Sequence, residues 1–290
     1  MLTSPVAAIG ATVRTLLTAG GVAVASVLAL KILVLIAEPM LTFLPVRALP
    51  ATPDGSGLPF EDLFIDTADG ARIHGWLVPG RRDGAAATPL TIIHFHGNAE
   101  NIGYCLPLAS LTRAAGHDLL LLDYRGYGRS AGRPTERGIY RDGEAALDHL
   151  RRRGVPDDRI VLWGRSIGAS VAVHLAASGA APAGVVIESG FTSARELLRG
   201  GAGIVLYPLT LLSSYRFDQA EKIGRVRSAL LFIHGTEDEV VPFALGRRLF
   251  DLAPGRKEFV AIEGGGHNDL LARHPGALWD AVARFLETLR

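Results

Sequence analysis

The chain has 290 residues, of which 48% are hydrophobic and 20% are charged, and this balance is typical of a globular protein rather than a disordered one. Its 30 Lys and Arg against 29 Asp and Glu leave a formal net charge of +1. The basic excess of a nucleic-acid-binding protein is therefore absent, and no nucleic-acid partner is expected. A single cysteine excludes an internal disulfide and a cysteine-rich zinc site.

An apolar segment lies near the start of the chain. Residues 16–37 read LLTAGGVAVASVLALKILVLIA, in which Lys31 is the one charged residue. At about 1.5 Å per residue this helix would reach roughly 33 Å, and a bilayer core is about 30 Å thick. We therefore predict a single-pass membrane anchor over residues 1–44. A cleaved signal peptide and a helix packed on the domain are the alternatives, and the few flanking positive charges do not fix the orientation of an anchor.

Residues 45–59, PVRALPATPDGSGLP, contain four prolines and two glycines, a composition typical of a linker. We place the folded domain at residues 60–290. Because no candidate site residue precedes residue 58, a chain that begins there is expected to keep its chemistry.

The domain sequence alternates strand and helix patterns. Residues 61–80 alternate apolar and polar side chains around an Asp-Gly pair, which predicts a hairpin. Runs of Val, Ile and Leu predict buried strands at 90–95, 118–124, 159–163, 183–188, 229–234 and 258–263. Helical patterns lie at 101–115, 136–153, 166–178 and 268–289. This alternation predicts an α/β fold whose mostly parallel central sheet has helices on both faces, with the ligand at the carboxyl ends of the strands.

The pattern G-x-S-x-G, which is typical of a nucleophilic serine on a sharp turn, occurs twice, around Ser130 and around Ser166. Ser166 follows the strand pattern RIVLWG and precedes the apolar helix pattern IGASVAVHLAAS, so it has the strand, turn and helix that such a serine requires. Ser130 is followed by Ala-Gly-Arg-Pro, and a helix cannot run from that serine through the proline. We predict that Ser166 is the nucleophile and that Ser130 is a turn residue.

A nucleophilic serine needs a base, and the base needs an acid to orient it. In this type of sheet the chain order is serine, acid, histidine. His267 follows three glycines after the last strand pattern, and we predict that it is the base, whereas His274 is expected at the surface. Asp238 follows the strand before it and is the predicted acid. Glu188, at the end of an earlier strand, is the competing acid.

The oxyanion of an acyl-transfer intermediate needs two hydrogen-bond donors. We predict the backbone amides of Ile167, directly after the nucleophile, and of Asn98, in the loop after the strand at 90–95. His94 and His96 share one face of that strand, but no third ligand lies nearby in the sequence. We therefore predict neither a metal nor a cofactor, and we expect His96 to stabilise its loop.

Several stretches, taken together, resemble one family. They are HFHGNAENIG, LDYRGYGRSAGRPTERGIYRD, WGRSIGASVAV, IESGFTSARE, FIHGTEDEVVP and GGGHND, which span about residues 90–270. They resemble the α/β-hydrolase superfamily, in particular its membrane-anchored serine hydrolases of the ABHD type. The resemblance implies the α/β-hydrolase fold, the triad Ser166, Asp238 and His267, and hydrolysis of esters, thioesters or occasionally amides without a cofactor.

The sequence thus predicts a membrane-tethered serine hydrolase whose partner is a small-molecule ester or acyl substrate, in keeping with a lipid-derived acyl group. An aminopeptidase or amidase on the same triad, and a non-catalytic scaffold with this fold, are the alternatives. The apolar stretch Ile204–Leu212 is interpreted either as a small lid over an acyl chain or as a helix packed on the domain. The oligomeric state is not predicted.

Overall fold

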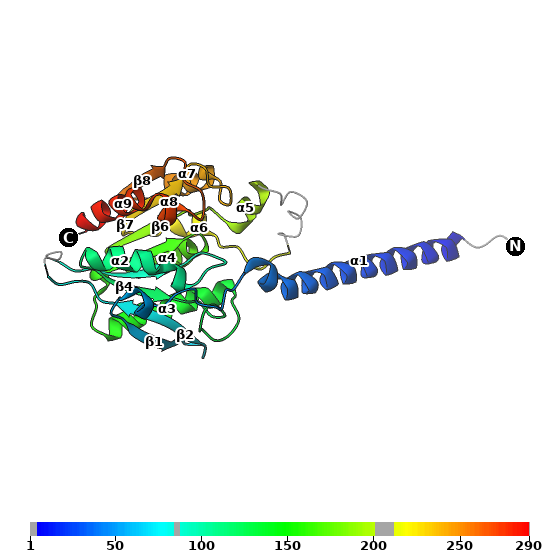
Figure 1. Cartoon of the computed structure of the whole chain (residues 1–290). Coiled ribbons are helices and arrows are strands. Elements are labelled where there is room, and N and C mark those ends of the chain that lie inside the picture. The colour runs from blue at the N-terminus through cyan, green and yellow to red at the C-terminus, as the bar shows by residue number, and fades with distance from the viewer. Residues whose placement is uncertain (1–4, 84–87, 201–211, 290) are drawn as a thin grey trace.

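The computed structural model describes residues 5–83, 88–200 and 212–289, and a twisted sheet runs through its domain (Figure 1). The strands are β1 (Glu61–Asp66), β2 (Arg72–Val78), β3 (Thr91–Phe95), β4 (Asp118–Leu122), β5 (Ile160–Arg165), β6 (Gly184–Glu188), β7 (Ala229–Gly235) and β8 (Lys257–Ile262). They lie side by side in the order β1-β2-β4-β3-β5-β6-β7-β8. The pairs β1–β2 and β2–β4 are antiparallel, and the other neighbouring pairs are parallel.

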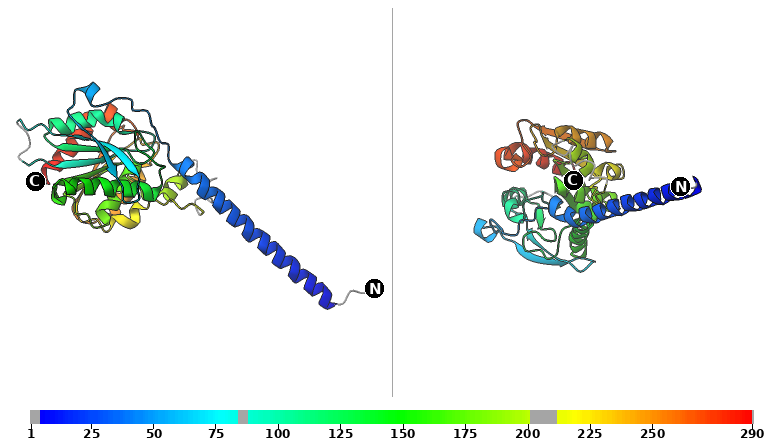
Figure 2. Two further views of the ribbon diagram at one scale, coloured as in Figure 1. Left: turned by 90° about the horizontal axis from the view of Figure 1, so that it is seen from below. Right: turned by 90° about the vertical axis from the view of Figure 1, so that its right-hand side faces the viewer.

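Helices cover both faces of this sheet (Figure 2). They are α2 (Leu106–Ala114), α3 (Glu136–Arg152), α4 (Ile167–Ala177), α5 (Ala194–Gly200), α6 (Gln219–Ile223), α7 (Phe243–Leu252), α8 (Leu270–Arg273) and α9 (Pro275–Glu287). Apolar side chains of α3, α4, α6 and α7 enter one buried cluster, and those of α2 and α9 enter a second. Strands β3 and β6 are buried at every residue, because both of their faces pack against helices. The predicted α/β fold is confirmed.

The helices differ from the predicted ones in three ways. The predicted helix 268–289 is broken at His274, because Pro275 starts α9 and disfavours helical backbone at the residue before it. The predicted helix 101–115 begins instead as a 3-10 turn, Ile102–Cys105. The sequence patterns also miss α5, α6 and α7, which have 7, 5 and 10 residues and so show too few turns for a clear period.

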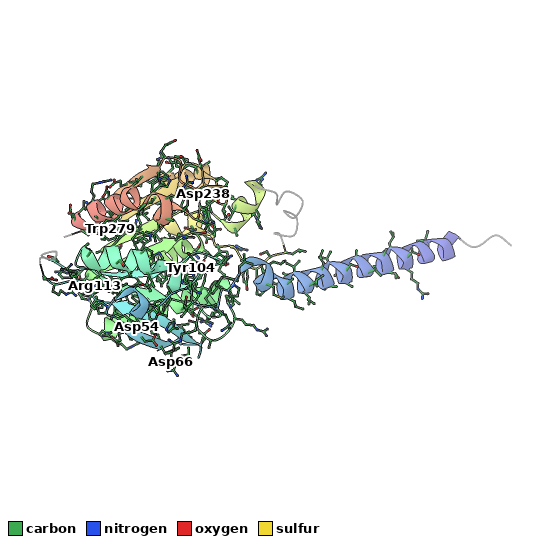
Figure 3. All side chains as sticks on the ribbon, in the orientation of Figure 1. Asp54, Asp66, Tyr104, Arg113, Asp238 and Trp279 are labelled. Atoms are coloured by element: carbon green, nitrogen blue, oxygen red, sulfur yellow. The ribbon has the colours of Figure 1, made fainter. Side chains whose placement is uncertain are left out.

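The first helix, α1 (Pro5–Thr42), projects from the domain as a long rod (Figures 1 and 3). Its portion Arg14–Thr42 is long and apolar enough to cross a membrane, and none of its most apolar stretch is buried in the protein. Its apolar side chains face outward along the rod (Figure 3). The alternative of a helix packed on the domain is therefore wrong for most of its length, whereas an anchor and a signal peptide both fit this geometry.

The segment that follows α1 lies on the domain. Phe43 is 2% exposed and belongs to the buried cluster under α3 and α4. The carbonyl oxygen of Val46 accepts a hydrogen bond from the amide of Gly128 at 2.9 Å, and Leu49 packs against the cluster under α2. Residues 45–59 have the composition of a linker, and main-chain hydrogen bonding and the packing of Leu49 hold this segment on the domain.

The insertion between β6 and β7 is described in part. Its apolar stretch Ile204–Leu212 lies outside the described residues except for Leu212. The lid over an acyl chain therefore stays a prediction.

Candidate active site

Ser166 occupies a sharp turn between β5 and α4. Its backbone has φ 54° and ψ −115°, a conformation that residues with a Cβ rarely adopt and that costs about 1–3 kcal/mol. A Cβ at Gly168 would overlap the carbonyl oxygen of Phe95, so only glycine lets α4 lie this close to β3. The turn places Ser166 at the carboxyl end of β5, as the sequence pattern predicts.

His267 and Asp238 approach Ser166 from two other loops at the same edge of the sheet. Ser166 Oγ lies 3.1 Å from His267 Nε2, and His267 Nδ1 lies 2.8 Å from Asp238 Oδ2. Ser166, His267 and Asp238 are 8%, 6% and 8% exposed. The structure therefore brings the three predicted residues together in the order hydroxyl, imidazole, carboxylate, in which a serine can pass its proton to a histidine.

The surroundings of Asp238 keep its carboxylate ionised. Oδ1 accepts a hydrogen bond from the amide of Val241 at 2.7 Å, while Oδ2 faces His267 and lies 3.3 Å from His234 Nε2. Burial by itself raises the pKa of a carboxyl group, but hydrogen bonds from His234, His267 and Val241 lower the pKa of Asp238 well below its ordinary value. An ionised Asp238 favours the tautomer of His267 with its proton on Nδ1, which leaves Nε2 free to accept a proton.

Glu188, the competing acid, has a different set of contacts. Its side chain accepts a hydrogen bond from Trp163 Nε1 at 2.9 Å, and its backbone carbonyl accepts one from the amide of Ser166 at 2.8 Å. Burial raises the pKa of the Glu188 carboxyl group, so this group is more easily neutralised than that of Asp238. The contacts therefore favour Asp238 as the partner of His267, and they assign Glu188 to the support of the turn.

The two predicted oxyanion donors lie beside the turn on neighbouring elements. Ile167 is the first residue of α4, where backbone amides have no partner within the helix. Asn98 lies in the loop after β3, the strand next to β5. Within the described part of the chain, no hydrogen bond occupies the amide of either residue, and both amides are thus available as donors.

An ion pair next to the turn, with largely buried side chains, is not predicted from the sequence. Arg165 lies 3.2 Å from Glu100 and donates a hydrogen bond to Asn268 Oδ1 at 3.0 Å. Burial disfavours the charge of Arg165, but nearby carboxylates, Glu100 first among them, raise its pKa. Arg165 thereby connects the loop of Asn98 to the loop of His267. The sequence feature that could have indicated this ion pair is a charged residue, Arg165, between an apolar strand pattern and an apolar helix pattern.

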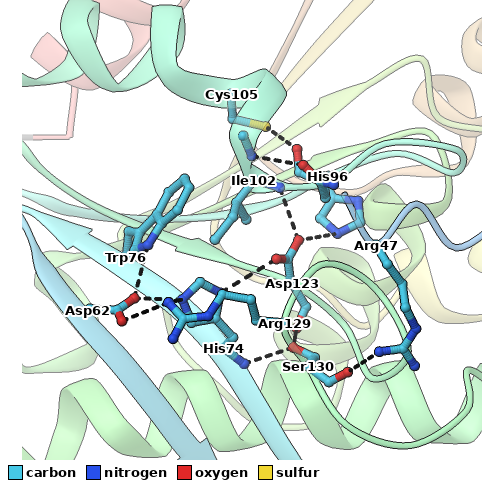
Figure 4. A network of polar contacts seen from close by, with 12 residues as sticks. Arg47, Asp62, His74, Trp76, His96, Ile102, Cys105, Asp123, Arg129 and Ser130 are labelled. Carbon is cyan, nitrogen blue, oxygen red and sulfur yellow. Dashed lines mark hydrogen bonds and ion pairs between the residues drawn. The ribbon is translucent and has the colours of Figure 1, made fainter. Parts of the chain in front are cut away.

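Ser130, in the other G-x-S-x-G copy, is bound into the interior of the domain (Figure 4). It is 0% exposed, its Oγ donates to the carbonyl oxygen of Asp123 at 2.7 Å, and the same Oγ accepts from the amide of His74 at 2.7 Å. Both partners are main-chain groups, so this hydroxyl connects β2 to the loop after β4. The geometry agrees with the predicted turn role of Ser130.

The other histidines singled out from the sequence lie outside this series of contacts. His94 is buried against Trp163, and burial lowers its pKa to about 3, so it is neutral. His96 Nδ1 lies 2.7 Å from the carbonyl oxygen of Gly97, which agrees with a role in stabilising its loop. His274, expected at the surface, is half-buried between α8 and α9. No cluster of metal-ligating side chains is found within residues 5–83, 88–200 and 212–289.

Comparisons with known proteins place this geometry in a family. A family model described as serine aminopeptidase, S33, matches residues 87–215. Rv2307c of Mycobacterium tuberculosis, an uncharacterized protein, is 36% identical over 227 residues, which are 78% of this chain and 79% of that protein. The alpha/beta hydrolase domain-containing protein WAV2 of Arabidopsis thaliana is 30% identical over 290 residues and covers 92% of both chains.

Solved structures share the fold. The esterase Pf2001 of Pyrococcus furiosus matches with a TM-score of 0.70 at 20% identity, over 84% of this chain and 98% of that one. A predicted CIB-like hydrolase of Thermoplasma acidophilum matches with a TM-score of 0.58 at 20% identity, over 80% of this chain and 100% of that one. Together with the relatives above, these similarities show that the chain belongs to the α/β-hydrolase family.

Proposed function

We propose that this chain is a serine hydrolase that cleaves carboxylic esters or thioesters through an acyl-enzyme on Ser166. The series of contacts from Ser166 Oγ through His267 to Asp238 supports this most directly. Ser166 Oγ attacks the carbonyl carbon while His267 Nε2 takes its proton, and the amides of Ile167 and Asn98 stabilise the oxyanion. His267 then gives the proton to the departing alcohol or thiol, which leaves the acyl group on Ser166.

Water completes the reaction. His267 Nε2 takes a proton from a water molecule as its oxygen attacks the acyl carbon, and the same oxyanion donors stabilise the second tetrahedral intermediate. Collapse releases the carboxylic acid, and His267 returns the proton to Ser166 Oγ. Asp238 stays ionised throughout and stabilises the imidazolium form of His267.

Labelling with a fluorophosphonate tests the assignment of the nucleophile, because the reagent reacts with an activated serine. The wild-type chain and Ser130→Ala should both be labelled, and Ser166→Ala should not. A folded wild-type chain that takes no label would instead support the alternative of a non-catalytic scaffold.

A second candidate activity is hydrolysis of an aminoacyl bond by the same residues. The family model that matches residues 87–215 is described as a serine aminopeptidase, whereas the structural neighbour Pf2001 is described as an esterase. We favour esters. The ratio of kcat/KM on p-nitrophenyl esters to that on aminoacyl p-nitroanilides should exceed one, and a ratio below one would favour the aminopeptidase.

We further propose that α1 anchors the enzyme in a membrane, where lipid-derived acyl substrates are the favoured class. The length of the helix and its unburied apolar surface support this. The full chain should then stay with the membrane fraction after extraction with carbonate and be released by detergent. Release by carbonate would contradict the anchor, and a mature chain that begins near residue 38 would identify a signal peptide.

A further inference from the structure

The carboxyl end of α1 is bound by the side chain of Asn98. Asn98 Nδ2 donates a hydrogen bond to the carbonyl oxygen of Thr42 at 2.7 Å, and Asn98 Oδ1 accepts one from the amide of Leu44 at 3.0 Å. The last carbonyl groups of a helix lack partners within it and carry its partial negative charge. An amide NH2 group at Thr42 therefore caps α1. Tyr127 adds a third bond, because its hydroxyl donates to Asn98 Oδ1 at 2.6 Å.

The helix end that Asn98 holds is itself fixed to the domain. Phe43 is 2% exposed and packs edge-on against the rings of Tyr215 and Phe217, with centroid distances of 5.6 and 6.0 Å. One turn earlier, the carboxylate of Glu38 accepts a hydrogen bond from the amide of Tyr215 at 3.0 Å. Asn98 therefore bonds to a helix end that is packed on the domain rather than to a free chain.

We propose that the end of α1 positions the oxyanion loop, with the Asn98 side chain as the connection. This rests on the proposed function, in which the backbone amide of Asn98 donates to the oxyanion. The side chain and the amide belong to one residue, so the bonds to Thr42 and Leu44 restrict where the amide points. The next residue, Ala99, has φ 59°, and such a strained backbone persists only where its surroundings hold it.

This connection revises an expectation from the sequence. A chain that begins near residue 58 contains every predicted site residue, but it lacks the carbonyl of Thr42 and the amide of Leu44 that Asn98 binds. The segment before residue 58 is thus part of the active-site scaffold as well as the link to the proposed anchor. An Asn98 side chain with this role is a positioning group, and its loss should affect kcat more than KM.

The first test uses Asn98→Ala in the full chain in detergent, with p-nitrophenyl butyrate as substrate. The substitution keeps the backbone amide but removes all three side-chain bonds. Loss of a whole oxyanion donor costs about 10²–10³ in kcat, so a displaced donor should cost about tenfold, with KM within about twofold. Active-site titration with a fluorophosphonate gives kcat per competent serine. An unchanged kcat per titrated site would overturn the proposal.

A double-mutant cycle separates this connection from a general loss of packing. Phe43→Ala loosens the end of α1, and we expect it to lower kcat by about threefold or more in the wild-type background but by less than about twofold with Asn98→Ala present. The matched control is Phe285→Ala, a buried phenylalanine of α9 that is 4% exposed and packs in the other cluster. Its kcat per titrated site should stay at the wild-type value. Losses from Phe43→Ala and Asn98→Ala that multiply would contradict the proposal.

A third measurement does not depend on turnover. Hydrogen exchange at the amides of residues 97–100 should be faster in Phe43→Ala than in the wild type, and it should be unchanged in Phe285→Ala. Unchanged exchange in Phe43→Ala would contradict the connection. Failure of the proposed function is seen separately, as a wild-type chain that takes no fluorophosphonate. Failure of this inference is an active, labelled enzyme in which Asn98→Ala leaves kcat per titrated site unchanged or Phe43→Ala leaves the exchange at residues 97–100 unchanged.

Discussion

Two turns of this molecule contain the same three residues, Gly-Arg-Ser at 128–130 and at 164–166, and their serines have different partners. The hydroxyl of Ser130 donates to one main-chain group and accepts from another, both at 2.7 Å, so it has no role left but a structural one. The hydroxyl of Ser166 lies 3.1 Å from an imidazole. The comparison teaches that the elements around a motif, and not its letters, decide which hydroxyl meets a base.

The arginines before the two serines also differ, in the burial of the ion pairs that they form. Arg129 pairs with Asp62 at 2.8 Å where both side chains are well exposed, and a pair of this kind contributes little to stability. Arg165 pairs with Glu100 at 3.2 Å where both side chains are largely buried, next to the proposed nucleophile. Arg129 lies at the protein surface. Arg165, the last residue of β5, connects the loop of Asn98 to the loop of His267.

The largest expected difference between the two serines is in turnover. Ser166→Ala should lower kcat on p-nitrophenyl esters by about 10⁵- to 10⁶-fold, as removal of the nucleophile does in serine hydrolases whose triad acts as a unit. Ser130→Ala should keep kcat per titrated site within about threefold of the wild type. Steady-state kinetics of the two purified variants checks this, and a Ser166→Ala enzyme with near-wild-type turnover would reassign the nucleophile.

The two candidate acids should differ by the next largest effect. Asp238→Asn should lower kcat by about 10⁴-fold, because the amide favours the wrong tautomer of His267. Glu188→Gln should lower it by less than about tenfold, because its side chain bonds to Trp163. The same kinetic assay decides the matter, and a reversed order of the two losses would move the acid to Glu188.

The pH profile of these variants sharpens that comparison. In the wild type kcat/KM should fall toward low pH, because a general base that already carries a proton cannot accept the serine proton. Since the pKa of Asp238 is lowered, Asp238 stays ionised across this fall, and the loss should involve one proton. Asp238→Asn removes the negative charge that favours the imidazolium, so its acid limb should move to lower pH. A limb that moves to higher pH would contradict this arrangement.

The contrast between the two serines also shows what the sequence could predict. The buried strand before Ser166 and the apolar helix after it have strong local patterns, so the sequence alone located the turn. His267 and Asp238 could be placed because parallel strands all end at one edge, and a residue just past a strand lies near that edge. The chain order of these residues then narrowed the choice.

What the sequence could not predict depends on contacts between distant segments. Asn98 bonds to Thr42 and Leu44, more than fifty positions earlier in the chain. No local sequence pattern predicts a side chain that caps a helix so distant in the sequence. The composition of residues 45–59 indicates a linker, yet the chain there is held by partners such as Gly128. Tertiary contacts override local composition in both places.

Ser130→Ala, which should keep its turnover, is expected to lose stability. Ser130→Ala leaves the buried carbonyl of Asp123 and the buried amide of His74 without the hydroxyl, and unsatisfied buried groups cost about 1–3 kcal/mol. We therefore expect Ser130→Ala to lower the free energy of unfolding by that amount while the enzyme stays active. Denaturant unfolding of the full chain in detergent measures it. An unchanged free energy of unfolding would mean that water replaces the hydroxyl.

The smallest expected effect concerns the strained backbone at Ser166. Both Ser166→Ala and Ser166→Gly remove the hydroxyl, but alanine retains a Cβ at φ 54° and ψ −115° whereas glycine adopts positive φ without that penalty. Glycine also gains conformational entropy in the unfolded chain, which offsets part of the relief. We expect Ser166→Gly to be more stable than Ser166→Ala by about 1 kcal/mol, measured as the difference in their unfolding free energies.

The corresponding pair of substitutions at Ser130 is a control, because Ser130 is not among the residues with positive φ. At that position the glycine variant should be no more stable than the alanine variant. Equal stabilities of Ser166→Gly and Ser166→Ala would show that the turn stores no strain, and the difference between the two loops would then lie in hydrogen bonding alone.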